Sequence, residues 1–324
     1  MNYKKSQVLI IATLLIIATV IVMPAEAGIQ EFLKKLTITG RATTSNVQIN
    51  ISLGNSVPNI TYVSVIAAQD VTEEGVKPVI FYFTANDSDG YQNIDATTAK
   101  ANFTYRNAST LIKRTNDTCK SLGNIDAKTL NFSCTIGLWY FDTAGVWNIT
   151  AYVEDVSGAK AQNRTASFTL SPTKAFKSGP GNLTFTGVGP GTTNTTPTNN
   201  PLTINNTGNF AFGINNISVN ATDLVGETDS GYALYARNFT IGITQGGSPL
   251  KECGGVNSSR LIKSGYQNIT NATLPYGNLS LGGGIAQEGL YLCLTLAGSE
   301  LISQAYSTTG PSGQGAWTVT TSVA

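Results

Sequence analysis

The sequence contains no histidine. Histidine is the usual general base of enzymes, the commonest protein ligand of transition metals, and the partner of the nucleophile in Ser-His and Cys-His hydrolases. Its absence removes each of those options, although an enzyme that uses carboxylates stays possible. We therefore expect a protein that is not an enzyme and has no catalytic residues.

Charge is also scarce. Charged residues make up 12% of the 324 residues, about half the share usual in soluble domains. The 20 basic and 19 acidic residues nearly cancel, so no basic field exists for nucleic acid or for an anionic membrane surface. A neutral, charge-poor surface tends to associate unless attached sugars solvate it or ordered packing covers it.

The first 27 residues are typical of a secretory signal peptide. Lys4 and Lys5 precede an apolar run, and Ala25-Glu26-Ala27 is a small-x-small cleavage site. The run is short for a membrane span, so we expect cleavage and export to the cell surface or beyond. The alternative is an uncleaved leader that anchors the protein in the membrane and is its sole membrane contact. Residues 28–35 are expected to form a short helix or a spacer.

The remaining chain alternates apolar and polar residues with a period of two, as strands with one buried face do. The clearest case is a hairpin within residues 139–170, with turn formers at 155–158. Its expected inward residues are Trp147, Ile149, Ala151 and Val153 in the first strand, and Ala166, Phe168 and Leu170 in the second.

Short strands separated by turn signals predict an all-β chain of two antiparallel β-sandwich domains. We expect the domains at 36–171 and 202–324, joined by a linker rich in Gly, Pro, Thr and Asn at 172–201. The linker contains one possible first strand of the second domain, at 182–185. The strands expected in the first domain are 47–53, 60–66, 78–84, 99–105, 111–114, 130–136 and the hairpin; those in the second include 217–222, 235–243, 289–296 and 316–321.

Two segments carry a family resemblance. VIFYFTANDSDGYQNI at 79–94 and FDTAGVWNITAYVEDVSGAKAQNRTASFTL at 141–170 resemble the immunoglobulin-like and PKD-like domains of prokaryotic cell-surface proteins. Residues 201–224 are similar to an edge strand of other immunoglobulin-like surface modules, and residues 36–45 resemble the start of archaeal envelope proteins. The resemblance implies two tandem immunoglobulin-like sandwiches on an archaeal surface protein. It implies little about function, since this fold hosts many roles.

Only four cysteines are present, Cys119, Cys134, Cys253 and Cys293. Four cysteines allow three connectivities, and their even division between the two expected domains favours one disulfide in each. The signal peptide implies an oxidising exterior in which such bridges persist. The alternative is two pairs of free, buried thiols. A zinc site lacks both histidine and a C-x-x-C pair.

Asparagine is abundant, and its placement is not random. About nineteen of roughly twenty-eight asparagines after the leader open an Asn-x-Ser/Thr sequon, where composition alone gives about six. In about ten, the middle residue is large and apolar, because positions i and i+2 of a strand share its outer face. Plain strand alternation is the alternative, but asparagine is a poor strand residue. The predicted glycosylation sites are Asn50, Asn59, Asn102, Asn107, Asn116, Asn131, Asn148, Asn163, Asn216, Asn220, Asn238, Asn268 and Asn278.

A cluster of aspartates is the one candidate metal site. Asp87, Asp89 and Asp95 offer the hard oxygen ligands that Ca²⁺ prefers. The spacing departs from the EF-hand loop, because Gly90 comes too early and no glutamate closes the loop. The alternative is a polar turn held by Asx hydrogen bonds. A structural Ca²⁺ is the only cofactor that we predict.

Three functions compete. The first is a glycosylated, non-enzymatic envelope or surface-layer protein whose partners are other envelope proteins or copies of itself. The second is an adhesin or binding module whose end loops hold a carbohydrate or a protein of another cell's surface; Trp139-Tyr140 is a candidate contact, although core packing is the favoured role of Trp139. The third is a secreted hydrolase that uses two carboxylates. The carboxylates available for it are Asp87, Asp89, Glu154 and Asp155.

Overall fold

The computed structural model of the protein describes residues 48–248, 250–282 and 284–322. The predicted signal peptide, the spacer and the archaeal-type segment at 36–45 lie outside these residues. The chain divides after residue 54, and the described residues from 55 onwards belong to one compact unit. Among the described residues, the helical elements are four short 3-10 segments, and none is long and apolar enough to cross a bilayer. The predicted β-rich, antiparallel fold class is confirmed.

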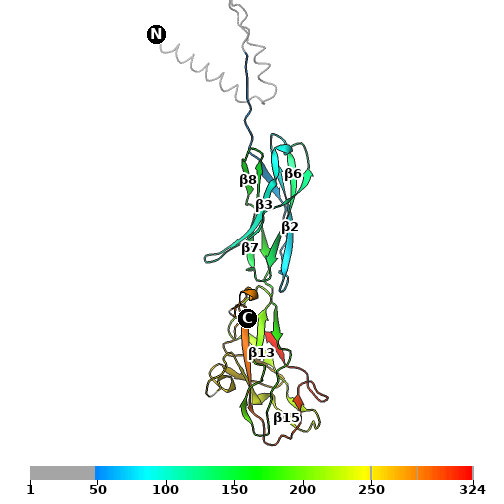
Figure 1. Cartoon of the computed structure of the whole chain (residues 1–324), viewed down its shortest axis with the longest axis vertical. Coiled ribbons are helices and arrows are strands. Elements are labelled where there is room, and N and C mark those ends of the chain that lie inside the picture. Colours follow the sequence, from blue (N-terminus) through cyan, green and yellow to red (C-terminus); the bar gives the residue numbers. More distant parts are fainter. Residues whose placement is uncertain (1–47, 249, 283, 323–324) are drawn as a thin grey trace, which may run out of the picture. The chain divides into compact units, whose positions relative to one another are not determined.

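Two antiparallel sheets contain the strands up to residue 170 (Figure 1). The first sheet consists of β1 (Asn59–Val63), β2 (Val76–Asn86), β6 (Thr129–Trp139) and β5 (Lys120–Asn124), in that spatial order. The second consists of β4 (Leu111–Asn116), β3 (Ile94–Arg106), β7 (Gly145–Asp155) and β8 (Lys160–Asn163), with β9 (Ser167–Leu170) also paired to β7. A single 3-10 turn, η1 (Tyr91–Asn93), precedes β3.

Aromatic side chains from both sheets fill one hydrophobic core. Phe83 of β2 stacks on Phe132 of β6 at 4.8 Å between ring centroids, and Phe103 of β3 meets Phe168 of β9 edge-on at 4.8 Å. All four are at most 4% exposed. Burying each large apolar side chain contributes roughly 1.5–3 kcal/mol, so this shared core holds the sheets together. The arrangement is compatible with a β-sandwich.

The predicted hairpin is present, but its second strand is divided. Trp147, Ile149, Ala151 and Val153 are at most 1% exposed, as predicted. β8 pairs with the C-terminal half of β7, and β9 pairs with its N-terminal half. Between them, the Asn163 side chain accepts a hydrogen bond from the Thr165 amide at 3.0 Å and turns the chain. Local side-chain hydrogen bonds of this kind compete with the sheet ladder.

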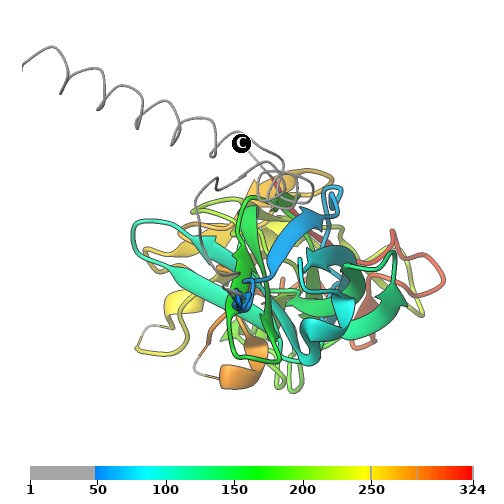
Figure 2. The same ribbon diagram turned by 90° about the horizontal axis from the view of Figure 1, so that it is seen from above.

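The strands after residue 170 form three further antiparallel sheets (Figure 2). The largest contains β10 (Phe176–Gly179), β12 (Leu202–Asn206), β19 (Gln287–Leu296), β16 (Phe239–Gly242) and β17 (Ser258–Arg260), with β11 (Thr193–Thr195) also on β19. The second contains β18 (Tyr266–Asn268), β13 (Ile217–Asn220) and β21 (Thr318–Thr321), and the third β15 (Ala233–Leu234), β14 (Leu224–Gly226) and β20 (Tyr306–Ser307). The 3-10 segments here are η2 (Ala236–Asn238), η3 (Lys251–Cys253) and η4 (Leu279–Leu281).

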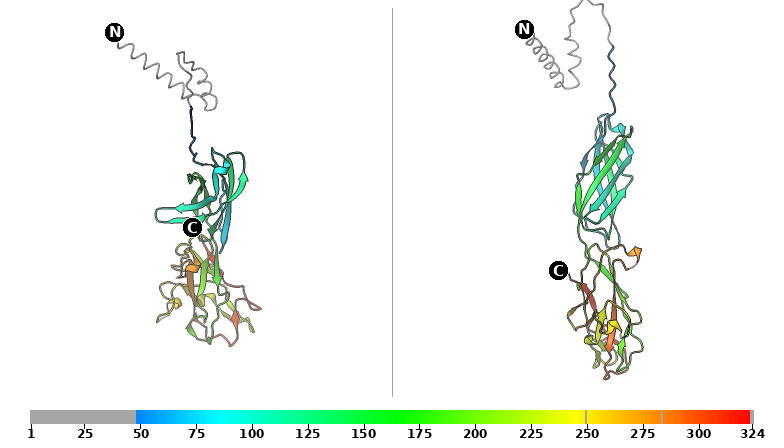
Figure 3. Two further views of the ribbon diagram at one scale, coloured as in Figure 1. Left: turned by 45° about the horizontal axis from the view of Figure 1, so that its top comes forward. Right: turned by 90° about the vertical axis from the view of Figure 1, so that its left-hand side faces the viewer.

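A second hydrophobic core lies among these strands, which are green to red in Figure 3. Its fully buried members include Ile204, Ile217, Ile241 and Leu290, from β12, β13, β16 and β19. The first core draws on residues 60–170 and the second on residues 204–301. The domain boundaries predicted from the sequence stay predictions.

Two expected strands are wrong. Residues 48–54 form no strand, and Ile49, Ile51 and Leu53 are 62%, 70% and 92% exposed. Alternation shows only that a segment has an apolar side; a strand also needs a neighbour to complete its ladder. Residues 182–185 are likewise irregular, and β10 takes the place of the expected first strand.

The cysteine pairing is as predicted. Cys119 is bonded to Cys134 of β6, and Cys253 of η3 is bonded to Cys293 of β19. No cysteine is free. Two disulfides indicate an oxidising setting. Each bridge joins a buried strand to a neighbouring loop segment, so the bridges fix the loops that precede β5 and β17.

Candidate glycan attachment sites

Most sequon asparagines lie at the surface. None of the nineteen is buried as a whole residue, whereas Asn206 and Asn209, which open no sequon, are 0% and 3% exposed. The side-chain oxygens of two, Asn205 and the predicted site Asn220, are nevertheless buried. Seven of the ten large apolar middle residues are at most 4% exposed: Ile60, Phe103, Phe132, Ile149, Ile217, Phe239 and Ile269. The period-two geometry that the sequence predicted therefore holds for most of these sequons. Ile51 is the clear exception, since residues 48–54 form no strand.

Two sequons face each other across adjacent strands. The sequon at 102–104 in β3 is in antiparallel register with the sequon at 148–150 in β7, so each asparagine lies opposite the other's threonine. The middle residues, Phe103 and Ile149, pair with each other in the core. Diagonal positions of this kind are roughly 7–8 Å apart. Sugars on both asparagines would shield the outer face of this sheet.

Other sequons lie in turns. The Asn107 side chain accepts hydrogen bonds from the Ser109 and Thr110 amides at 3.0 and 2.7 Å. The Asn278 side chain accepts from the amide and hydroxyl of Ser280 at 3.0 and 2.6 Å. These Asx turns use the amide oxygen. The nitrogen, where a sugar would be attached, donates to the Tyr105 hydroxyl at 3.3 Å in Asn107 and to no described residue in Asn278.

Some sequon amides are already engaged. Asn116 Nδ2 donates to the Thr135 carbonyl at 2.9 Å, and Asn163 Nδ2 donates to the Ile60 carbonyl at 3.1 Å. A sugar on either nitrogen replaces one of its two hydrogens, so it must preserve or displace that contact. The predicted sites are therefore not equivalent. The side-chain nitrogens of Asn102 and Asn148 donate to no described residue, so a sugar could be attached there without displacing a hydrogen bond.

The candidate calcium cluster is a hydrogen-bonded turn. Asp87 is fully buried, and its carboxylate accepts from the Asp89 amide at 2.9 Å and from Asn93 Nδ2 at 3.1 Å. Asp89 accepts from the Ser56 amide, and Asp95 from Thr97. Within the described residues, no group of three or more acidic, cysteine or histidine side chains has the geometry to hold a metal ion. The contacts match the polar-turn alternative; calcium binding stays a prediction.

The carboxylates available to a hydrolase are engaged in structural contacts. Burial pushes the pKa of Asp155 up, but hydrogen bonds from Asn55 Nδ2 and from the Ala159 and Ser157 amides more than offset it, so the net pKa is lowered. Asn93 Nδ2 donates to Asn55 Oδ1 as well as to Asp87. A chain of amides thus links the two aspartates, which the sequence did not predict.

Glu154 is paired with a phenol. The Tyr152 hydroxyl hydrogen-bonds to the Glu154 carboxylate, and this bond, with burial and the nearby negative charge, raises the pKa of Tyr152 to about 12. The Nζ atom of Lys160, whose side chain is exposed, lies 3.9 Å from the same carboxylate. This arrangement holds two outward side chains of β7 together.

The sequence analysis missed an apolar outer face on the first sheet. On β2, Val76, Ile80 and Tyr82 are 41%, 56% and 45% exposed, and Tyr62 of β1 and Trp139 of β6 are 53% and 44% exposed. We call these five residues the apolar face. The favoured core role of Trp139 is wrong: its partner in the predicted pair, the neighbouring Tyr140, is the buried one, at 7% exposed. The signal was the continuous apolar run of β2, which is typical of strands buried on both faces.

Comparisons with known proteins place the chain in no family. No protein-family model matches it, and no curated protein sequence matches it.

Proposed function

We propose that the protein is a non-enzymatic glycoprotein of the cell envelope, exported by its leader and built from tandem immunoglobulin-like sandwiches of archaeal type. The observation that carries the proposal is the division within the seven sequons whose middle residue is large and buried: the asparagine is not buried, while the residue after it enters the core. A chain with only 12% charged residues needs another source of surface solvation. Sugars at the sequon asparagines provide it.

The role of such a protein is to contact its neighbours in the envelope. The outer side of the first sheet supports this part of the proposal. Its sequon asparagines gather at one end, where Asn59 pairs with Asn86 and Asn131 pairs with Thr84. The apolar face begins beside them, since Tyr62 also pairs with Thr84 and Tyr82 pairs with Ser133 of the Asn131 sequon, and it extends to the other end, where Val76 pairs with Trp139. Exposed apolar patches bounded by polar residues mark protein contact sites, so we assign this face to contacts with copies of the protein or with other envelope proteins.

Intact mass spectrometry of the native protein tests the glycoprotein assignment. We expect a mass well above that of the chain from Gly28 to Ala324 with two disulfides, and a return to that mass after enzymatic or chemical removal of N-linked sugars. Peptide mapping should place the sugars at sequon asparagines. Native protein at the bare polypeptide mass would reject the proposal.

The apolar face predicts that self-association depends on Trp139 and Ile80. Replacing both with serine should weaken association at least tenfold in sedimentation equilibrium. It should lower the free energy of unfolding by no more than about 2 kcal/mol, since the two side chains are 44% and 56% exposed. Val146→Ser, which removes a 59% exposed apolar side chain from β7 in the other sheet, is the matched control. Equal association of the double variant and the control would contradict the assignment.

A pocket favours a second candidate, a binding module. A cavity of about 420 Å³ opens among residues of the linker and of the segment at 301–306, with Phe185, Leu234, Leu294 and Tyr306 in its lining. That volume is in the range of small-ligand sites. The lining combines loop residues such as Phe185 and Ile302 with residues of β15, β19 and β20, so only part of the pocket lies in loops, where the adhesin hypothesis places a ligand. Binding of a sugar or peptide that is lost in Tyr306→Ala, with self-association unchanged, would favour this candidate.

A further inference from the structure

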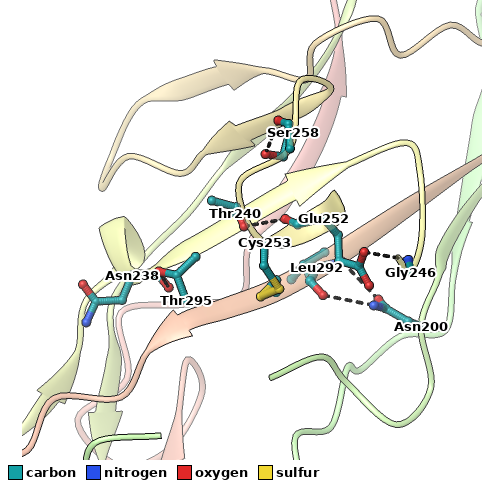
Figure 4. The surroundings of a disulfide bond; sticks show 11 residues. Asn200, Asn238, Thr240, Gly246, Glu252, Cys253, Ser258, Leu292 and Thr295 are labelled. Carbon is teal, nitrogen blue, oxygen red and sulfur yellow. Dashed lines mark hydrogen bonds between the residues drawn. A yellow bond between two sulfur atoms is a disulfide. The ribbon is translucent and has the colours of Figure 1, made fainter. Parts of the chain in front are cut away.

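Two sequons bury the hydroxyl that defines them. In Asn216-Ile217-Ser218, Ser218 is 3% exposed and its Oγ lies 3.0 Å from Thr320 Oγ1. In Asn238-Phe239-Thr240, Thr240 is 7% exposed and its hydroxyl donates to the Glu252 carbonyl at 2.6 Å. Figure 4 shows the Thr240 hydroxyl directed at Glu252, while the Asn238 amide points away from it. In both sequons, the asparagine that would accept the sugar is not buried, whereas the hydroxyl that the transferase must recognise is buried.

Their position in the sheets explains this division. Each asparagine lies just before its strand, and the hydroxyl residue lies inside it. β13 runs between β18 and β21, and β16 runs between β17 and β19, so both strands have hydrogen-bonded neighbours on both sides. The middle residues, Ile217 and Phe239, are in the second core at 0% and 1% exposed. An enzyme that is to hold either sequon must first remove a central strand from its sheet.

The loop sequons need no such opening. Asn107 and Ser109 lie in the exposed turn between β3 and β4. Asn163 ends β8, and Thr165 follows it before β9, with Ser109 and Thr165 exposed. The recognition hydroxyls of these two sequons are accessible in the folded protein, although Asn107 Nδ2 donates to the Tyr105 hydroxyl and Asn163 Nδ2 to the Ile60 carbonyl. They provide an internal comparison for the two buried hydroxyls.

The chemistry of attachment makes access to the hydroxyl decisive. In N-glycosylation, asparagine Nδ2 bonds to C1 of a sugar carried on a lipid-linked glycosyl phosphate or diphosphate. The C1–O bond to phosphate breaks, the phosphate leaves with the electron pair, and Nδ2 loses a proton. An amide nitrogen is a weak nucleophile, so the rate depends on holding it in position. The sequon requirement for Ser or Thr at the third position means that the transferase must also bind that hydroxyl.

We propose that Asn216 and Asn238 receive their sugars before the strands after residue 170 have folded. This inference rests on the proposed glycoprotein function. Both asparagines stay outside the core, and neither Nδ2 donates a hydrogen bond to another described residue, so the finished fold has no buried contact there for a sugar to displace. Only the approach of the enzyme is blocked, and it is blocked from the moment β21 covers Ser218 and Thr240 binds Glu252.

Site-by-site occupancy provides the test. Unglycosylated chain, either folded with its disulfides or reduced and S-alkylated, is incubated with membranes of the producing cells, which supply the transferase and the lipid-linked sugar. In the folded chain we expect Asn107 and Asn163 to be modified and Asn216 and Asn238 to react at least tenfold more slowly. In the alkylated chain the four rates should be similar. In native protein all four sites should carry sugar.

Each outcome decides the inference. It is overturned if folded chain is modified at Asn238 as fast as at Asn107. It is also overturned if native protein carries sugar at Asn107 and Asn163 but at neither Asn216 nor Asn238, a result that leaves the glycoprotein function intact. Native protein without sugar at any sequon removes the proposed function and this inference with it.

Discussion

Replacing Asp142 with asparagine is expected to lower the free energy of unfolding by about 3–5 kcal/mol, because it breaks a buried ion pair from one side. The Asp142 carboxylate is fully buried. It accepts from Arg114 Nε at 3.0 and 3.1 Å, again from the Arg114 Nη2 group, and from the Trp139 amide at 2.8 Å. An asparagine amide can neither neutralise the guanidinium nor accept all of these bonds. Urea unfolding of both proteins measures the difference.

The Arg114–Asp142 pair has a ready control on the surface. Lys160 and Glu154 are 3.9 Å apart, with side chains 66% and 26% exposed, so Lys160→Met should cost less than about 1 kcal/mol. The double variant Arg114→Met/Asp142→Leu should recover much of the loss, because it removes both charges from the interior. If Asp142→Asn costs no more than Lys160→Met, solvent relieves the buried charge and our account of the pair is wrong.

The ion pair also marks where prediction from this sequence ends. Arg114 is on an edge strand and Asp142 follows β6, so their contact depends on the register of β3 with β4 and on the turn before β7. Alternation fixes which face of a strand a residue occupies, but not which residue of another strand it meets. For the same reason, the network that joins Asp87 to Asp155 through Asn93 and Asn55 has no signature in the sequence.

The features that depend only on alternation were predicted correctly. The inward residues of β7 and the unburied sequon asparagines follow from a period of two and need no knowledge of topology. Trp139 follows the same rule, although a core role was expected for it: the even-numbered residues of β6 from 130 to 138 are buried, so Trp139 is exposed and Tyr140 is buried. Ser218 shows the limit of the method, because β13 is buried on both faces and an alternating pattern predicts a single buried face.

The attachment sites could be predicted only in part. The sequence identifies every sequon, but it does not distinguish the Asn107 turn from the Asn238 sequon, whose hydroxyl is bound by a residue twelve positions away in η3. That distinction depends on which strands flank β16. The occupancy test therefore examines a property of the fold, although the motif itself belongs to the sequence.

The second large effect is expected from the Cys253–Cys293 disulfide. Replacing both cysteines with alanine should cost about 4 kcal/mol, and the same change at Cys119 and Cys134 about 3 kcal/mol, because a bridge that closes a longer loop removes more entropy from the unfolded chain. The separations are 40 and 15 residues. Thermal or urea unfolding of the two double variants, each against the parent, measures both values.

The surroundings of the second bridge add to this expectation. Cys253 lies in η3 next to Glu252, which is 1% exposed. The Glu252 carboxylate accepts a hydrogen bond from the Gly246 amide at 2.8 Å (Figure 4). Without the disulfide, η3 is held on β16 and β19 by this bond and by the Thr240 hydroxyl, so its opening exposes a buried carboxylate to water. Local opening should then appear as faster hydrogen exchange at Gly246 and Gly255 than in the Cys119/Cys134 variant. Equal costs for the two bridges, with exchange unchanged in η3, would mean that strand pairing already holds this segment and that loop closure contributes little to it.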